Sequence, residues 1–360
     1  MTAQLKIGFL TNQNPYNRNS YSGALYFMLR ALESHPGFNV ELLGGYRPIK
    51  EGILGRLFPG SKDQFHFKRE EFQGLDAVIA PVASDLVARY GSKICPPIML
   101  ITDTTPSYLR EFYPEAAAGV SDDTEIEAFS NTESVVYSSQ YMADRAQDEF
   151  TNLSGKQVGV APLGINLSNL PSKPMKKDPM EPLEMVFIGK SWKRKGGDMA
   201  LKTLDELRNR GINAHLKIIG PSLPEARAHN HVEALGYIDK HRPKEAGIYE
   251  RALKNAHVLI SPTRADCTPM VIAEANMFSC PVAITEVGGV SSLMRSGVNG
   301  EMLQVNDGPK EWADVIENMT IKNNDYEALC CSSFEYAQLR LSWEAWAQSI
   351  FEYTYEAINK

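Results

Sequence analysis

Short apolar runs alternate along the chain with segments in which apolar residues recur at helical spacing. In the first half, runs that predict strands lie at 6–10, 40–43, 77–80, 98–101, 135–138 and 158–161. Helical periodicity separates several of them, as in Ala24, Leu25, Met28, Leu29 and Leu32, and over 141–150. This alternation is typical of parallel strands with helices on both faces of the sheet.

The second half repeats the scheme after a segment without periodicity. Residues 166–182 are rich in proline and lysine, as linkers are. Beyond them, strands are predicted at 185–188, 216–219, 232–235, 258–261, 282–285 and 302–305, and helices at 198–210, 248–255, 270–278 and 308–319. The last segment, 343–358, is amphipathic at helical spacing.

We therefore predict an α/β chain with two Rossmann-like domains whose parallel sheets face each other across a cleft. The expected boundaries are 1–168 for the first domain, 169–183 for the linker, 184–342 for the second domain and 343–360 for a final helix. In this architecture ligands bind at the carboxyl ends of the strands.

Composition excludes several classes of function. A net charge of −7 argues against non-specific nucleic-acid binding, and no apolar run reaches the 18 residues of a membrane span. The five cysteines lack metal-ligand spacing, so reduced thiols and no metal site are expected. The first strand is not followed by G-x-G-x-x-G, which argues against an oxidoreductase. Because the N-terminus enters a strand without a signal-peptide pattern, we expect a cytoplasmic protein.

The most informative stretch is 264–289, which predicts a loop, a short helix, a strand and a Gly-Gly turn. Thr268 is a good helix cap, and Pro269 suits the first helical position. The next amides, Met270 and Val271, would then point out of the helix end, where anions bind. Two acids, Asp266 and Glu274, flank this helix start, which suits a ligand that carries phosphate and hydroxyl groups. An ordinary capped helix with two surface acids remains the alternative.

A second candidate anion site follows the strand at 185–188. Four cations, from Lys190 to Lys195 and including Arg194, lie between Gly189 and the helix entrance at Gly196. Lys190 and Lys195 would stabilise negative charge on a departing diphosphate. A solvated basic turn is the alternative.

The remaining candidate site residues each lie in a loop that follows a predicted strand. Small or flat residues there would let a nucleotide base lie against the backbone, and the loop before residue 24 would close over a donor or bind acceptor hydroxyls. These candidates are Gly220, Tyr237 and Ile238 in the second half, and Ser22, Gly23 and Asp103 in the first.

Taken together, these motifs resemble the retaining GT-B glycosyltransferases of family 4. The matching segments are FIGKSWKRKGGDMAL, ALGYIDK, LISPTRADCTPMVIAEA, PVAITEVGG and SGVNGEMLQV, which cover about 184–305. The first half matches more loosely, through LKIGFLTN, the loop at Ser22 and VAPLGINL. The final helix is similar to one that crosses back onto the first domain in this family.

The resemblance implies roles for the motif residues. The family's pair of acids seven residues apart corresponds to Asp266, for donor-sugar hydroxyls, and Glu274, for ribose hydroxyls. Lys190 and Lys195 occupy the places of the Arg/Lys pair that binds the diphosphate, so no divalent metal is expected. The expected nucleotide-binding set also includes Gly189, Arg194, Gly196, Thr268, Met270, Val271, Gly220, Tyr237, Ile238, Ser22 and Gly23.

The implied function is retaining transfer of a sugar from a UDP- or GDP-sugar, without a cofactor, in cell-surface glycan synthesis. The acceptor would be a glycan, a lipid-linked molecule or a small molecule. The first domain would bind the acceptor and the second the nucleotide sugar. A catalytically weak sugar-nucleotide-binding protein or a GT-B epimerase is the alternative.

Four departures from the family pattern bear on this function. Asp266 replaces a glutamate, Pro269 a glycine and Lys190 a common arginine, and Thr102-Asp103 stands where a strand-end histidine is usual. We expect them to mark a different donor sugar. The mixed apolar and basic stretch 45–71 suggests peripheral contact with the inner face of a membrane, or else a surface loop beside the acceptor site.

Overall fold

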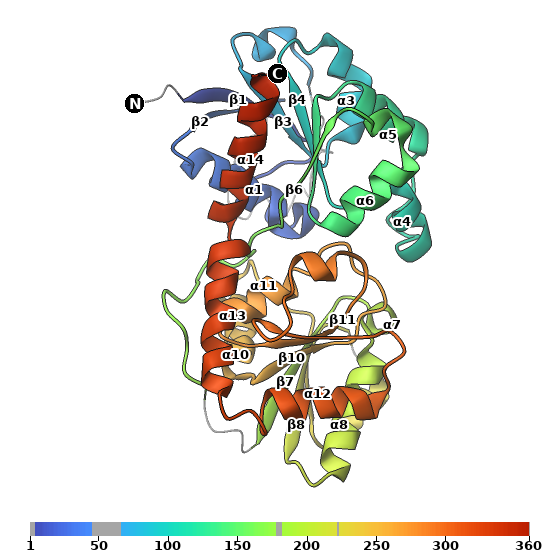
Figure 1. Ribbon diagram of the computed structural model, residues 1–360, viewed down its shortest axis with the longest axis vertical. Coiled ribbons are helices and arrows are strands. Elements are labelled where there is room, and N and C mark those ends of the chain that lie inside the picture. The colour runs from blue at the N-terminus through green and yellow to red at the C-terminus, as the bar shows by residue number, and fades with distance from the viewer. Residues whose placement is uncertain (1–3, 45–65, 178–181, 222, 360) are drawn as a thin grey trace, which may run out of the picture. The chain divides into compact units, whose positions relative to one another are not determined.

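A computed structural model describes residues 4–44, 66–177, 182–221 and 223–359. The chain forms two compact units, each described here by itself (Figure 1). Unit 1 contains Met1–Asn166 together with Trp343–Lys360, and unit 2 contains Leu167–Ser342. The last helix therefore belongs to the same unit as the first strand.

Unit 1 is built on a parallel sheet of order β2-β1-β3-β4-β5-β6. Its strands are β1 (Leu5–Phe9), β2 (Phe38–Leu42), β3 (Ala77–Pro81), β4 (Ile98–Thr102), β5 (Ser134–Tyr137) and β6 (Gln157–Val160). Its helices are α1 (Ala24–Ser34), α3 (Ser84–Tyr90), α4 (Pro106–Phe112), α5 (Asp122–Ser130), α6 (Gln140–Glu149) and α14 (Trp343–Ile358). Because consecutive strands are parallel, each needs a crossover, and helices supply most of them.

Helix α14 lies beside α1 in unit 1 (Figure 1). Glycines let its aromatic rings approach the backbone. A Cβ atom at Gly37 would come within 2.3 Å of the Phe351 ring, and one at Gly159 within 2.6 Å of the Tyr353 ring. The Tyr353 hydroxyl also accepts a hydrogen bond from the Val160 amide at 3.1 Å. The amphipathic pattern at the end of the chain is therefore explained by packing on unit 1.

Unit 2 is built on a parallel sheet of order β12-β11-β10-β7-β8-β9. Its strands are β7 (Leu183–Ile188), β8 (Ala214–Ile219), β9 (Val232–Gly236), β10 (Val258–Ser261), β11 (Val282–Thr285) and β12 (Gly300–Leu303). Its helices are α7 (Trp192–Lys195), α8 (Gly197–Asn209), α9 (Pro224–Ala228), α10 (Pro243–Asn255), α11 (Val271–Met277), α12 (Pro309–Met319) and α13 (Tyr326–Arg340). Counted from β9, the order is 3-2-1-4-5-6, that of the Rossmann fold, and the order reverses between β7 and β10.

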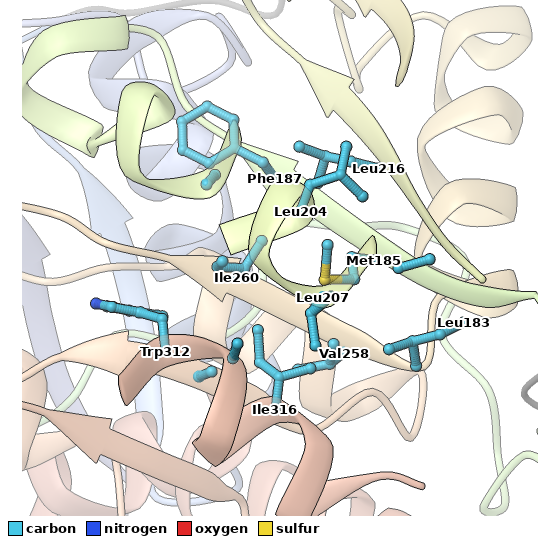
Figure 2. Close-up of a cluster of buried hydrophobic side chains, with 14 of the residues drawn as sticks. Leu183, Met185, Phe187, Leu204, Leu207, Leu216, Val258, Ile260, Trp312 and Ile316 are labelled. Atoms are coloured by element: carbon cyan, nitrogen blue, oxygen red, sulfur yellow. The ribbon is translucent and has the colours of Figure 1, made fainter. Parts of the chain in front are cut away.

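The core of unit 2 is closed on one face of the sheet by α8 and α12. Leu204 and Leu207 of α8 and Ile316 of α12 pack onto apolar side chains of the central strands β7, β8 and β10 (Figure 2). Trp312 of α12, at 1% exposure, is among the largest fully buried side chains. This packing holds the central strands, whose carboxyl ends carry the candidate site.

The twelve predicted strands all occur, each within two residues of its expected ends. The predicted helices also occur, although α10 begins five residues earlier than expected, at Pro243. Helices α4, α5, α7, α9 and α13 were not predicted. The predicted linker carries no helix or strand over residues 167–177, and the Lys177 ammonium donates to the carbonyls of Leu253 and Lys254 in unit 2.

Residues 45–65 of the apolar and basic stretch 45–71 lie outside the described residues. Beyond that point, the Phe67 ring stacks on Phe72 and on Tyr90, with centroids 5.3 and 4.8 Å apart. Among the residues that the structure describes, no helix is long and apolar enough to cross a membrane.

Candidate functional site

Two predicted site residues meet where the strand order of unit 2 reverses. Lys195 ends α7, just after β7, and Asp266 lies in the loop after β10. The Lys195 ammonium donates to the Asp266 carboxylate, and both residues are less than 10% exposed. Removing either partner of a buried ion pair leaves an uncompensated charge, so each side chain depends on the other.

Neighbouring arginines hold the loop that carries Asp266. The Arg194 guanidinium donates to the Ala265 carbonyl at 2.7 Å. One guanidinium nitrogen of Arg264 donates to both carboxylate oxygens of Asp198, at 2.9 and 3.1 Å. Partial burial opposes ionisation of Asp198, but Arg264 outweighs it and lowers the pKa of that carboxyl. Arg194, expected to bind an anion, thus also ties α7 to the acidic loop.

The Gly-Gly turn after β11 completes this support. The Gly289 amide donates to the Asp266 carbonyl at 2.9 Å. The main chain on both sides of the Asp266 carboxylate is therefore fixed by hydrogen bonds, which presets the direction of the side chain.

Glu274, in α11, is the most deeply buried of the predicted acids, at 1% exposure. Lys240, in the loop between β9 and α10, donates to its Oε1, and the Tyr249 hydroxyl of α10 donates to its Oε2 at 2.5 Å. Burial, together with the charge and hydrogen bond of Glu274, raises the pKa of Tyr249 well above its ordinary value. Tyr249 therefore stays protonated and remains a donor to the carboxylate.

At the carboxyl edge of this sheet, close packing explains the predicted glycines. A Cβ atom at Gly189 would lie 2.7 Å from the Lys195 side chain, so the lysine stem rests on that glycine. Gly196 (φ +75°) and Gly220 (φ +126°) have positive φ, and a Cβ atom at either would lie 1.9 Å from a carbonyl oxygen. Only glycine fits such positions without strain.

The predicted start of the 270–278 helix is wrong. Helix α11 begins at Val271 with Met270 as its N-cap residue, so Thr268 is not the cap and Pro269 is not the first helical residue. The Ile272 amide donates to the Pro269 carbonyl at 3.0 Å, which closes a tight turn ahead of the helix. This turn shifts the helix start, and Thr268 is buried in the loop before it.

The remaining candidates of unit 2 lie at the ends of their strands. Lys190 is exposed directly after β7. Tyr237, 63% exposed, follows β9, and Ile238 is half-buried beside it. All three thus lie on loops at the carboxyl edge that also carries Lys195 and Asp266.

Ser22, Gly23 and Asp103 belong to unit 1. Ser22 and Gly23 have φ of +54° and +90°, and they form a left-handed turn into α1. The Asn166 amide donates to the Ser22 carbonyl at 3.1 Å. Asp103 follows β4, so it shares the carboxyl edge of its own sheet with the loop after β1.

Sequence reasoning missed Lys240 and Tyr249. The available signal was weak: Lys240 closes the matched segment ALGYIDK, and Tyr249 lies nine residues further, at a position that reads as core. Within the described ranges, no group of three or more His, Cys, Asp or Glu side chains is arranged to hold a metal ion.

Residues 182–321 match the family model of glycosyl transferases group 1. This part of the chain is also similar to the D-inositol 3-phosphate glycosyltransferase of Paenarthrobacter aurescens, at 27% identity over 45% of this chain and 43% of that protein. The putative teichuronic acid biosynthesis glycosyltransferase TuaC of Bacillus subtilis is 26% identical over 42% of this chain and 39% of its own length. The chain thus matches less than half the length of these relatives.

Solved structures extend the likeness to both units. The lipopolysaccharide outer core galactosyltransferase WaaB has a TM-score of 0.64 at 13% identity, covering 97% of this chain and all of that one. Anabaena HepE, in complex with UDP and glucose, has a TM-score of 0.60 at 16% identity and covers 98% of this chain and all of its own. With two six-stranded parallel sheets of Rossmann type, the protein has the GT-B fold of these glycosyltransferases.

Proposed function

We propose that the protein is a retaining glycosyltransferase that moves a sugar from a UDP- or GDP-sugar to a glycan, lipid-linked or small-molecule acceptor. The observation that carries the proposal is the buried Lys195–Asp266 pair at the switch point of unit 2, within the region that matches glycosyl transferases group 1. Rossmann-type sheets bind nucleotides at this point. The similarity to the putative teichuronic acid biosynthesis glycosyltransferase TuaC supports a role in glycan synthesis.

Lys195 has the charge and the spare donors that a diphosphate needs. An ammonium group has three donors, and Asp266 occupies one. The others stabilise charge that develops on the leaving diphosphate, and the exposed Lys190 supplies a second cation. Because these cations take the part of a divalent metal, sugar transfer should be unchanged by EDTA.

The acids are assigned to hydroxyl groups of the donor. Asp266 binds hydroxyls of the transferred sugar, and Glu274 binds those of the ribose. In unit 1, Asp103 and the turn at Ser22 and Gly23, which share the carboxyl edge of that sheet, are assigned to the acceptor.

The test combines ligand binding with turnover. UDP, GDP and ADP are screened by thermal shift, since a specific ligand raises the apparent melting temperature. Transfer is then measured for Lys195→Met and Glu274→Gln, which keep side-chain volume in buried positions where alanine would leave a cavity. Each should lower turnover by about 100-fold or more, because an electrostatic stabiliser or a donor ligand is lost.

Lys217→Met is the matched control. Lys217 forms a half-buried ion pair with Glu184 at 2.5 Å, also in unit 2 but away from the candidate site. Its loss should leave turnover unchanged. Wild-type turnover in both Lys195→Met and Glu274→Gln would contradict the site assignment.

A catalytically weak sugar-nucleotide-binding protein is the second candidate, favoured by the shorter acid Asp266 and its engagement by Lys195. Binding of UDP or GDP without product on any acceptor would support it. An epimerase would instead change the sugar nucleotide with no acceptor present.

A further inference from the structure

Glu274 is held by donors from two other parts of unit 2, and each donor takes a different oxygen. Lys240 approaches from the loop after β9 and Tyr249 from α10. The Lys240 ammonium also lies 5.9 Å from the centroid of the Tyr249 ring. The three side chains therefore lock one another, although they are separated by up to 34 residues in sequence.

The two contacts leave Glu274 with a defined acceptor capacity. An ionised carboxylate has about four lone-pair sites, two on each oxygen. Lys240 and Tyr249 use one on each oxygen, so two of the four sites are not taken by these donors. Two acceptors on neighbouring atoms match the two hydroxyls of a vicinal diol.

Because Glu274 is buried, its carboxylate depends on the two side chains that contact it. At 1% exposure, Glu274 cannot be solvated by bulk water, so a charge without a partner there is costly. Lys240, whose side chain is 18% exposed, supplies the compensating charge, and the Tyr249 hydroxyl fixes the rotation of the carboxylate.

We propose that Lys240 and Tyr249 are positioning residues that hold Glu274 for the ribose diol, and that they thereby make the site select ribonucleotides over deoxyribonucleotides. The proposal rests on the proposed function, because the diol is that of a nucleoside diphosphate donor. A site built to bind a hydroxyl rejects the analogue that lacks it, provided that its acceptors are held in place.

Calorimetric titration tests the selection, with UDP and GDP each compared with its 2′-deoxy form. Wild type should prefer the ribose form by about tenfold or more. Lys240→Met and Tyr249→Phe should each reduce that ratio several-fold, and Lys240→Arg should restore part of it. Lys244→Met removes an exposed charge from the start of α10 and should leave the ratio unchanged. An unchanged ratio in Lys240→Met and Tyr249→Phe would overturn the proposal.

A ligand-free measurement separates this proposal from the proposed function. Lys240→Met should lower the apparent melting temperature by about 6 °C or more, because a buried charge loses its partner. Adding Glu274→Gln to that variant should recover most of the loss. Additive effects of the two substitutions would overturn the positioning role. If wild type binds neither UDP nor GDP, the proposed function and the ribose selection fail together. The double-mutant cycle of Lys240→Met and Glu274→Gln still decides whether Lys240 positions Glu274.

Discussion

Glu125 is a buried carboxyl group in unit 1, outside the candidate site. It lies in α5 at 6% exposure. Burial raises its pKa to about 7; a hydrogen bond from Ser84 opposes the shift, and the nearby Asp122 and Asp85 add to it. Its ordinary value is 4.5. Because the pKa of Glu125 is higher in the folded state than in the unfolded state, protonated Glu125 favours folding. This contribution to stability is complete below about pH 4.5 and is lost as the pH rises towards 7.

Glu125→Gln should therefore stabilise unit 1 more at pH 8 than at pH 5. From pH 5 to pH 8 the free energy of unfolding of the wild-type protein falls by on the order of 3 kcal/mol. The Gln variant does not undergo this fall, because an amide does not ionise. Thermal unfolding at pH 5, 6, 7 and 8 measures the difference. Glu127→Gln, on an exposed position of the same helix, is the control. A difference between Glu125→Gln and wild type that stays constant with pH would contradict the expectation.

The chemistry of the site residues was accessible from sequence, but their partners were not. Asp266 and Lys195 stand out because they follow predicted strands, and Glu274 because it lies inside the helix that Asp266 precedes. The Lys195–Asp266 contact joins residues 71 apart, and the Lys240–Glu274 contact joins residues 34 apart. Only the order of the strands brings these loops together, and no local pattern encodes that order.

Helix α14 depends on glycines that lie beneath its aromatic rings. Gly159→Ala should destabilise unit 1 by about 1–3 kcal/mol, because the new methyl group would lie 2.6 Å from the Tyr353 ring. Denaturant unfolding measures this change. Gly247→Ala in α10 is the control, because its Cβ atom would meet nothing closer than 3.9 Å. Wild-type stability of Gly159→Ala would show that α14 is not seated as tightly as described.

Helices with a clear hydrophobic periodicity were predicted from the sequence, and helices without it were missed. Helix α13 has Cys330, Cys331, Ser332 and Ser333 near its centre, residue types with low helix propensity. Helix α11 is clear from its apolar residues, but its start is not. Thr268 has the preferred cap chemistry, yet the tight turn that Pro269 begins delays the helix to Val271.

At the scale of the whole molecule, unit 2 is inserted into unit 1. The chain leaves unit 1 after Asn166 and returns at Trp343. These two crossings lie together within unit 1, since the Trp343 indole donates to the Ile165 carbonyl at 3.0 Å. Gly164 makes room for it, as a Cβ atom there would lie 2.5 Å from the indole ring. Unit 1 is therefore completed only when both ends of the chain have folded.

This topology predicts that damage to α14 is confined to unit 1. Trp346 is 1% exposed and packs edge-on against Trp343, with centroids 5.3 Å apart. Trp346→Ala should cost about 3–5 kcal/mol in unit 1, because it leaves a large cavity. Hydrogen exchange should then show lost protection in β1, β4 and β6, and unchanged protection in β7, β8 and β10. Equal losses in the strands of unit 2 would mean that the two units unfold as one cooperative block, and the insertion would then carry no independent stability.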